Sequence, residues 1–234
     1  MSRVFNGDIA NFLSAAVGVG ADRANFSIMA WVKTAATASG IAHTLNNSFN
    51  SPRLQSVTGT FPLQALFGST GSNVVDFDNR IVSDSWLCLV GVTTPTRSTL
   101  RAGAGNYETT SAYTSLLASA VSALRVGSGD SLSPWNGKIA HVAAWNRELL
   151  AAEIDTLTGG GNPNSIASAA RWYYYPLTDA SLGNVWTPTD GDTAGALTVN
   201  GTVASDAGDN PTVTGGGGGS AAAAAHYYRR RRAA

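Results

Sequence analysis

The stretch LRVGSGDSLSPWNGKIAHVAAWNRELLAAEIDTL, residues 124–157, decides the fold. Its pattern indicates a strand, a loop rich in Pro, Gly and Asn, a long strand over residues 135–145, and then a short helix. Side chains alternate along a strand, so residues 137–145 should present two faces, neither of them strongly polar. This pattern is typical of a strand buried inside a sandwich. One face would carry Ile139, His141, Ala143 and Trp145, and the other Lys138, Ala140, Val142 and Ala144.

The helix after this strand is the one helix that the sequence predicts clearly. Asn146 is the predicted N-cap, and the run Gly159-Gly160-Gly161 should end the helix. Its apolar residues recur at helical spacing: Leu149, Leu150, Ile154 and Leu157.

The rest of the chain offers short strand candidates separated by turn residues. Turn signals about every 8 to 12 residues, without alternating βα units, indicate an all-β sandwich or barrel. The clearest candidates are FSIMAWVK (26–33) and WLCLVGVT (86–93). In the first, one face would carry Phe26, Ile28, Ala30 and Val32, and the other Met29 and Trp31. Further candidates are 4–14 with a turn at Asn6-Gly7, 40–45, 54–58, 63–67, 74–77, a hairpin of 99–102 with 107–110, and 196–203 with a bend at Asn200-Gly201.

Length and composition suit one domain with an attached tail. The 234 residues are 44% hydrophobic and only 13% charged, and residues 1–214 can bury the core of a single all-β domain. Residues 215–234, GGGGGSAAAAAHYYRRRRAA, are of low complexity and should form a flexible tail. No run reaches the roughly 18 apolar residues of a membrane helix, and the opening MSRVFNGDIANF lacks the apolar core of a signal peptide. Neither a membrane location nor an ordinary secretory route is therefore expected.

The single cysteine, Cys88, lies in an apolar run. It is expected to be a buried and inert thiol, and no disulfide can form within the chain.

The net charge of zero conceals a difference between the body and the tail. Residues 1–214 hold 11 of the 15 Lys and Arg and all 15 Asp and Glu, a net charge of −4, and the tail adds +4. Arginine pairs with phosphates and tyrosine stacks on bases, but the same residues also dock on acidic protein surfaces. Because the body is acidic and shows no nucleic-acid-binding pattern, we expect a protein partner rather than nucleic acid. The docking residues of the tail would be His226, Tyr227, Tyr228, Arg229, Arg230, Arg231 and Arg232.

Four stretches together resemble one family. They are VFNGDIANFLS (4–14), FSIMAWVK (26–33), WLCLVGV (86–92) and, most specifically, LRVGSGDSLSPWNGKIAHVAAWNRELLAAEI (124–154). In this order they are similar to the concanavalin A-like jelly roll in its laminin-G-like branch, over about residues 3–213. The resemblance implies an all-β, two-sheet antiparallel jelly-roll sandwich with one short helix.

The resemblance does not carry the family's binding chemistry with it. Ala140 and His141 stand where many members have acidic residues. Leu87 and Cys88 stand where they have a His pair. The sandwich is therefore a firmer expectation than any inherited ligand site.

Catalysis is not expected. A retaining glycosidase needs two carboxylates about 5 Å apart, and the resemblance implies that hydrolytic members place Glu and Asp at alternate positions of one strand. Asp76 and Asp78 would share one face of a strand, but they fit the entry to a turn at Asp78-Asn79 better. The glutamates form no such pattern: Glu108, Glu148 and Glu153.

Metal sites have weak support. A calcium ion would take oxygens from loops, and the candidates also fit plain turns, so no cofactor is predicted. The candidates are Asp190, Asp192, Asp206 and Asp209. The three histidines lack metal-ligand spacing, so no transition metal is expected: His43, His141 and His226.

A glycan would bind to exposed aromatic side chains with polar neighbours. Trp135, Trp186 and Tyr107 lie in or beside predicted loops and are the candidates for such a platform. The core-like strands hold the tryptophans that should pack inside: Trp31, Trp86 and Trp145.

These features together favour a non-enzymatic structural protein of a bacteriophage virion. The expected role is a jelly-roll domain displayed on the particle surface, as capsid decoration or cement or as a head or tail fibre-like part. It would be held by its basic tail and by neighbouring copies in an oligomer, with other capsid or tail proteins as partners and a host-surface glycan as a further candidate ligand. Two alternatives stay open: an extracellular glycan-binding (lectin-like) module and a degenerate glycan hydrolase.

Overall fold

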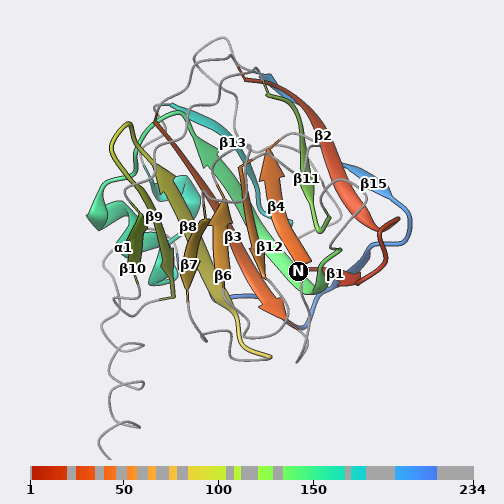
Figure 1. Ribbon diagram of the computed structural model, residues 1–234. Helices are drawn as coiled ribbons and strands as arrows, with labels where there is room; N and C mark the ends of the chain where they lie inside the picture. Colours follow the sequence, from red (N-terminus) through yellow and green to blue (C-terminus); the bar gives the residue numbers. More distant parts are fainter. Residues whose placement is uncertain are drawn as a thin grey trace, which may run out of the picture.

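The computed structural model describes residues 2–19, 25–34, 40–45, 52–56, 63–66, 74–77, 84–103, 108–111, 121–128, 134–166, 170–177 and 193–214. Within these residues two antiparallel β-sheets face each other (Figure 1). Sheet A contains, in spatial order, β10 (Glu108–Ser111), β9 (Ser98–Ala102), β8 (Leu87–Thr93), β3 (Phe26–Thr34), β12 (Asn136–Trp145), β1 (Ser2–Asn6) and β16 (Ala204–Asp206), with β13 (Arg171–Tyr175) also beside β12. Sheet B contains β14 (Thr193–Ala194), β2 (Phe12–Val19), β11 (Val121–Val126), β4 (Gly40–Leu45), β5 (Arg53–Ser56), β6 (Leu63–Leu66) and β7 (Val74–Phe77), with β15 (Thr198–Asn200) also beside β2. This arrangement confirms the predicted all-β, two-sheet jelly-roll sandwich.

The observed strands follow the predicted ones closely, with two informative differences. The predicted hairpin of 99–102 with 107–110 is the antiparallel pair β9–β10. The segments on either side of the Asn6-Gly7 turn, β1 and β2, lie in different sheets, so this turn joins the two layers. Of the strand predicted over 196–203, residues 198–200 form β15; the chain bends at Gly201, whose φ is +66°, and passes from sheet B to β16 of sheet A, which lies beyond the predicted strand.

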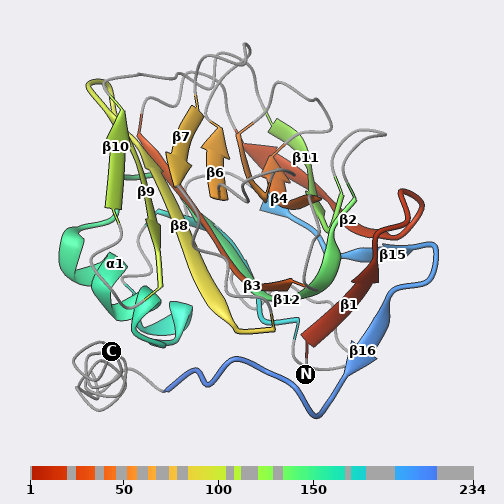
Figure 2. The same cartoon turned by 60° about the horizontal axis from the view of Figure 1, so that its bottom comes forward.

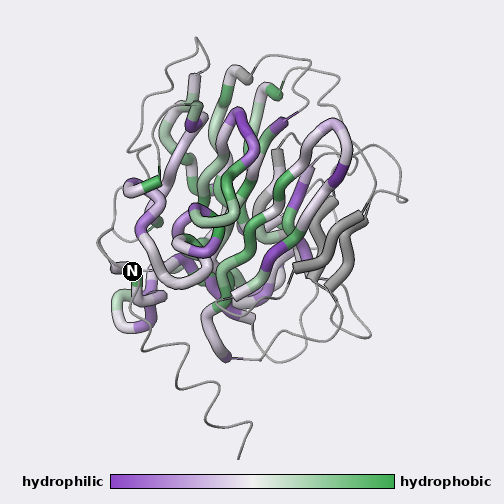
Figure 3. The backbone as a smooth tube through the Cα atoms, turned by 90° about the vertical axis from the view of Figure 1, so that its left-hand side faces the viewer, coloured by the Kyte–Doolittle hydropathy of each residue, from purple (hydrophilic) through white to green (hydrophobic). Residues whose placement is uncertain are grey.

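Sheet A is buried on both faces, so the apolar side chains form two cores. The inner core lies between the sheets, and the outer core lies between sheet A and the helix beside it (Figure 2). Figure 3 shows the hydrophobic stretches running along the central strands. Strand β3 serves both cores and confirms its predicted alternation: Phe26, Ile28, Ala30 and Val32 face the inner core, and Met29 and Trp31 the outer one.

The alternation predicted for β12 is wrong beyond His141. The pairing of β12 with β3 shifts register between Ala140 and Ala143, and His141 has a φ of 49°, in the left-handed region. This bulge inserts one residue, so every later side chain changes face. The inner core therefore receives Ile139, Val142 and Ala144, and the outer core Ala140, Ala143 and Trp145.

The side chains of His141 and Cys88 are both buried. His141 is 6% exposed, and its Nδ1 lies 2.7 Å from the hydroxyl of Tyr174. Cys88 is fully buried in the outer core, which confirms the predicted burial of its thiol.

Helix α1 (Ala151–Thr158) lies where it was expected but begins later. Leu150, rather than Asn146, is the N-cap, and its N–H donates to the Glu153 carboxylate at 2.8 Å. The intervening residues are tied to β3, because the Ser27 hydroxyl accepts from the Leu149 N–H at 3.1 Å and donates to the Arg147 carbonyl at 2.9 Å. The predicted end at Gly159 is confirmed. No helix among the described residues has the length and apolar character needed to span a membrane.

Candidate functional site: a C-terminal strap and its lysine seat

The last described residues, 204–214, form an extended segment that we call the strap. It begins as β16, which pairs with β1 in the register Ser2 to Asp206 and Val4 to Ala204. It then crosses the outer side of sheet A toward α1 (Figure 2). At its end the Thr214 N–H donates to the Gly160 carbonyl at 2.8 Å, and the Thr214 carbonyl accepts from the Asn162 N–H at 3.1 Å. The end of the strap at Thr214 is therefore fixed beside the residues that follow the helix.

A pair of lysines on sheet A receives the strap. Lys33 of β3 and Lys138 of β12 are direct cross-strand neighbours, an arrangement in which like charges repel. The Asp209 carboxylate lies between them, and its Oδ2 accepts from Lys33 Nζ at 2.8 Å and from Lys138 Nζ at 2.6 Å. Its Oδ1 accepts from Trp86 Nε1 at 2.9 Å. We call the three donors, Lys33, Lys138 and Trp86, the seat.

Further contacts reinforce the seat. Lys138 Nζ also donates to Asp206 at 2.7 Å, and Lys33 Nζ forms an ion pair with the exposed Asp84 at 2.9 Å. The backbone carbonyl of Asp209 accepts from the Ser2 hydroxyl at 2.8 Å. The strap is thus held by side chains from β1, β3, β12 and the start of β8.

The electrostatics favour the charged forms of Lys33 and Lys138 in the seat and of Asp206 and Asp209 in the strap. Hydrogen bonds from Lys138 and Lys33 hold the pKa of Asp209 far below its usual range. A hydrogen bond from Lys138 likewise lowers the pKa of Asp206. The carboxylates in turn raise the pKa of both lysines, chiefly through Asp209 for Lys33 and Asp206 for Lys138. The lysines of the seat and the aspartates of the strap therefore stay charged at neutral pH and form an ionic fastening. A proton donor or acceptor for catalysis would instead need a pKa near the working pH.

Two of the four calcium candidates lie in this fastening. The oxygens of Asp206 and Asp209 face two lysine ammonium groups, whose positive charge opposes a divalent cation in the same place. Within the described ranges there is no group of three or more His, Cys, Asp and Glu side chains that could hold a metal ion. The other two candidates, Asp190 and Asp192, lie outside the described residues.

The predicted exposure of Trp135 is wrong. Its side chain is 1% exposed and belongs to the inner core. Glycines let the chain approach it closely, since a Cβ at Gly40 would lie 2.6 Å from the Trp135 Cα and one at Gly137 would lie 3.1 Å from its Nε1. Trp135 directly precedes β12, beside a predicted loop, yet its indole packs into the inner core.

The backbone of Trp135 joins both sheets. Its carbonyl accepts from the Gly7 N–H, just after β1, at 3.0 Å, and its N–H donates to the Gly127 carbonyl, just after β11, at 2.8 Å. The Gly127 N–H donates in turn to the Ala42 carbonyl of β4 at 3.1 Å. Trp135 therefore closes one end of the sandwich and has a structural role.

The remaining predicted site residues lie outside the described part of the chain. These are Trp186 and Tyr107 of the glycan platform, and the tail residues His226, Tyr227, Tyr228, Arg229, Arg230, Arg231 and Arg232. Asp78, the partner of Asp76 in the carboxylate pair, lies there as well.

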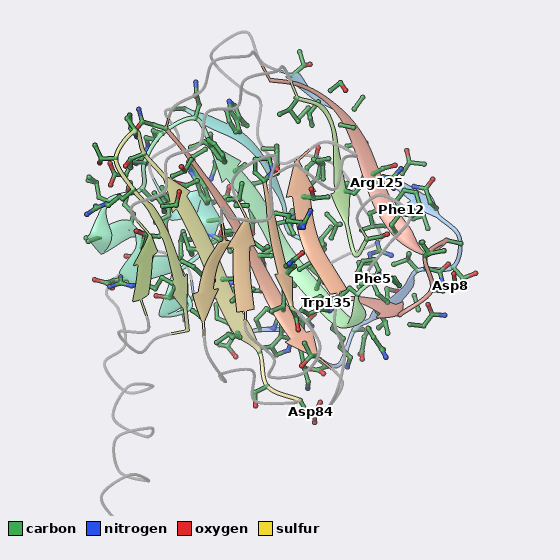
Figure 4. All side chains as sticks on the ribbon, in the orientation of Figure 1. Phe5, Asp8, Phe12, Asp84, Arg125 and Trp135 are labelled. Carbon is green, nitrogen blue, oxygen red and sulfur yellow. The ribbon has the colours of Figure 1, made fainter. Side chains whose placement is uncertain are left out.

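The structure adds one surface feature that the sequence argument missed. On the outer face of sheet B, the guanidinium carbon of Arg125 lies 4.4 Å from the centre of the Phe12 ring (Figure 4). Beside them, the Asn200 amide donates to the Ser14 hydroxyl at 2.9 Å. Alternation along β2 and β11 would have placed Phe12, Ser14 and Arg125 outward, but their pairing depends on a strand register that the sequence does not reveal.

Comparison with solved structures gives matches of low sequence identity across most of the fold. A heptameric SAP-like pentraxin from Limulus polyphemus matches with a TM-score of 0.57 and 13% identity, over 83% of this chain and 94% of the pentraxin chain. A candidate carbohydrate binding protein from Bacteroides ovatus matches with a TM-score of 0.57 and 13% identity, over 86% of this chain and 60% of the other. The enzymatically active domain of tailspike protein 2 from bacteriophage CBA120 matches with a TM-score of 0.50 and 15% identity, over 68% of this chain but only 27% of the tailspike chain.

At these identities the structural matches establish the fold alone. A comparison with curated proteins finds no sequence match. A family model described as the concanavalin A-like lectin/glucanases superfamily, in its Laminin_G_3 form, matches residues 7–155. This match covers more than half of the 234 residues, so the chain belongs to the concanavalin A-like lectin/glucanase superfamily.

Proposed function

We propose that the chain is a non-enzymatic virion protein of a bacteriophage, a jelly-roll domain displayed on the particle surface and anchored through its C-terminal tail. The observation that carries the proposal is the strap, whose last residue, Thr214, is held beside α1 and whose Asp209 is held by the seat. A pull on the tail of an anchored copy would therefore be borne by the hydrogen bonds and ion pairs of the strap.

The composition of the tail suits an anchor. Five glycines give a flexible start, and the Tyr and Arg residues at the tip can bury aromatic area and form bidentate pairs with carboxylates. For a flexible chain of this length the mean reach is roughly 25 Å, which is enough to cross to a neighbouring subunit. We therefore assign the tip an acidic surface on another capsid or tail protein as its partner.

The carboxylates of the described residues support a role without catalysis. The general acid of a glycosidase needs a raised pKa. Here Arg147 lowers the pKa of Glu153, and lysines lower those of Asp206 and Asp209. Other carboxylates form ion pairs or hydrogen bonds within the domain: Asp84 with Lys33, Glu148 with Arg97, Asp155 with Arg101, and Asp8 with the Ala10 N–H.

The direct test removes residues 215–234 and leaves the strap intact. We expect the truncated chain to fold with an unchanged far-UV circular dichroism spectrum and thermal midpoint, and to be lost from purified particles. Replacing Arg229, Arg230, Arg231 and Arg232 by Ala should cause the same loss, whereas deleting only Ala233 and Ala234 should not. Incorporation of the truncated chain at the level of the full chain would refute the anchoring role.

A second function is favoured by the Arg125 and Phe12 pair on the outer face of sheet B. A cation above an aromatic ring, with an amide and a hydroxyl beside it, offers stacking area and hydrogen bonds to a sugar. As a glycan-binding module, the domain should lose binding on a glycan array when Phe12 or Arg125 is replaced by Ala. Replacements of Trp186 and Tyr107 test the sequence-based platform separately. A wild-type chain that binds no glycan on the array would exclude this function.

A further inference from the structure

We propose that the strap is exchanged between copies: in an isolated chain it occupies the chain's own seat, and in an assembly it occupies the seat of a neighbouring copy. This would supply the contact between neighbouring copies that the virion role requires. The exchange rests on the proposed function only in taking the virion as the place where copies meet. The seat and the strap themselves can be tested in solution without particles. The partner is therefore a second copy of this chain.

The strap can be separated from the rest of the chain. It follows β15, which stays on sheet B, and the short link 201–203 carries the chain across to sheet A. The start of this link is fixed to the body, since the Thr202 N–H donates to the Asn11 side chain at 2.6 Å and Gly201 packs against Ala10 and Asn11. Beyond it, the strap is held by its pairing with β1, by the seat and by the backbone of residues 160–162.

The contacts of the strap do not depend on which copy supplies it. Strand β16 adds to the edge of sheet A by backbone pairing with β1, a mode in which any extended segment of suitable sequence can take part. The other contacts join side chains of the strap to the seat and to the backbone of 160–162. Two copies facing each other across their β1 edges can therefore form the same contacts reciprocally, as a twofold interface requires.

Charge complementarity makes the strap the specific occupant of the seat. An empty seat would leave Lys138 and the Trp86 N–H without the strap carboxylates, and Lys33 with the exposed Asp84 in place of Asp209. The strap brings Asp206 and Asp209, two carboxylates spaced to reach Lys138 and Lys33. A seat that has lost its own strap should therefore accept the matching strap of another copy in preference to a neutral segment.

Concentration decides between the two arrangements. The contacts are the same whether a seat holds its own strap or that of a neighbour, so the chain's own strap is favoured only by its effective concentration near the seat. For a short intramolecular link this concentration is of about the millimolar order. A dilute solution should therefore contain monomers. Copies fixed side by side on a particle have similar local concentrations, so exchange becomes competitive there.

The test uses two full-length variants with reversed charges. In the seat variant, Lys33→Asp and Lys138→Asp repel the variant's own strap; in the strap variant, Asp206→Lys and Asp209→Lys repel its own seat. Each variant alone should be a monomer in size-exclusion chromatography with light scattering. An equimolar mixture should form a heterodimer that dissociates at high salt, because each strap fits the other chain's seat. A mixture that stays monomeric while both variants keep their circular dichroism spectra would overturn the exchange.

A second measurement does not rely on charge reversal. Val4 and Ala204 are register partners of β1 and β16, so Val4→Cys and Ala204→Cys in one chain should form an internal disulfide and confirm the pairing. When the two cysteines are on separate chains, oxidation at millimolar concentration should give a covalent dimer, and Cys88 is buried and should not interfere. Absence of this dimer would also overturn the exchange. Neither result depends on the tail, so a failure here leaves the anchoring role of residues 215–234 to its own test.

Discussion

Replacing Trp135 by Ala should destabilise the domain strongly, because the structure gives this side chain a packing role. A buried tryptophan removes about 150–250 Å² from water, which at roughly 25 cal/mol per Å² corresponds to about 4–6 kcal/mol. Trp135 Nε1 is buried without a hydrogen-bond partner among the described residues. Its removal should return about 1–3 kcal/mol of desolvation cost. The expected loss in the free energy of unfolding is therefore roughly 1–5 kcal/mol, with about 3 kcal/mol as its centre.

Urea denaturation followed by circular dichroism measures this loss directly, as a shift of the transition midpoint with an unchanged slope. Val199→Ala is the matched control, because Val199 is 41% exposed and its truncation should change stability by less than about 0.5 kcal/mol. Trp135→Phe should fall between the two. A loss below about 1 kcal/mol for Trp135→Ala would refute the inward position of the indole and restore Trp135 as a candidate for the glycan platform.

Three further predictions follow from buried or strained positions. Gly127 has a φ of +88°, and a Cβ there would lie 2.1 Å from the Phe5 ring, so Gly127→Ala should lower the free energy of unfolding by about 2–4 kcal/mol, measured by urea denaturation. Gly208→Ala is the control and should be tolerated, because a Cβ there would lie 3.6 Å from its nearest neighbouring atom. Burial lowers the pKa of His141 to about 4, so the unfolded chain takes up a proton first as the pH falls below about 6.5. The contribution of His141 to stability should be constant above that pH and fall by roughly 3 kcal/mol toward pH 4, and His141→Asn should remove this part of the slope. Burial raises the pKa of the Cys88 thiol, so a thiol reagent should label it only at the rate of unfolding, and rapid labelling of the native chain would contradict its burial.

Strand β3 shows what the sequence alone could determine. Its apolar residues alternate without interruption, so both of its faces and its central position were predictable. Strand β12 has the same apolar character, yet the faces of its second half were predicted wrongly. A bulge adds one residue without changing the composition, and with alanines on both sides of it the hydrophobic pattern does not record the shift.

The seat could not have been predicted, for a different physical reason. Lys33 and Lys138 meet only through the register of β3 with β12, and Asp209 reaches them only after the chain crosses from sheet B to sheet A. Each residue in isolation is an ordinary surface charge. The same aspartates were considered as calcium ligands, because local sequence reveals the oxygens but not the lysines that neutralise them.

The bulge at His141 also determines which changes of chain length the protein can tolerate. Deleting this single residue would give a strand that alternates simply and keeps the observed faces, with Val142 and Ala144 toward sheet B and Ala143 and Trp145 toward the helix. Deleting Ala144 instead, with the bulge retained, would turn the Trp145 indole toward sheet B, into space that an alanine fills. Loss of one residue from this strand should therefore be tolerated at the bulge and not in the residues that follow it.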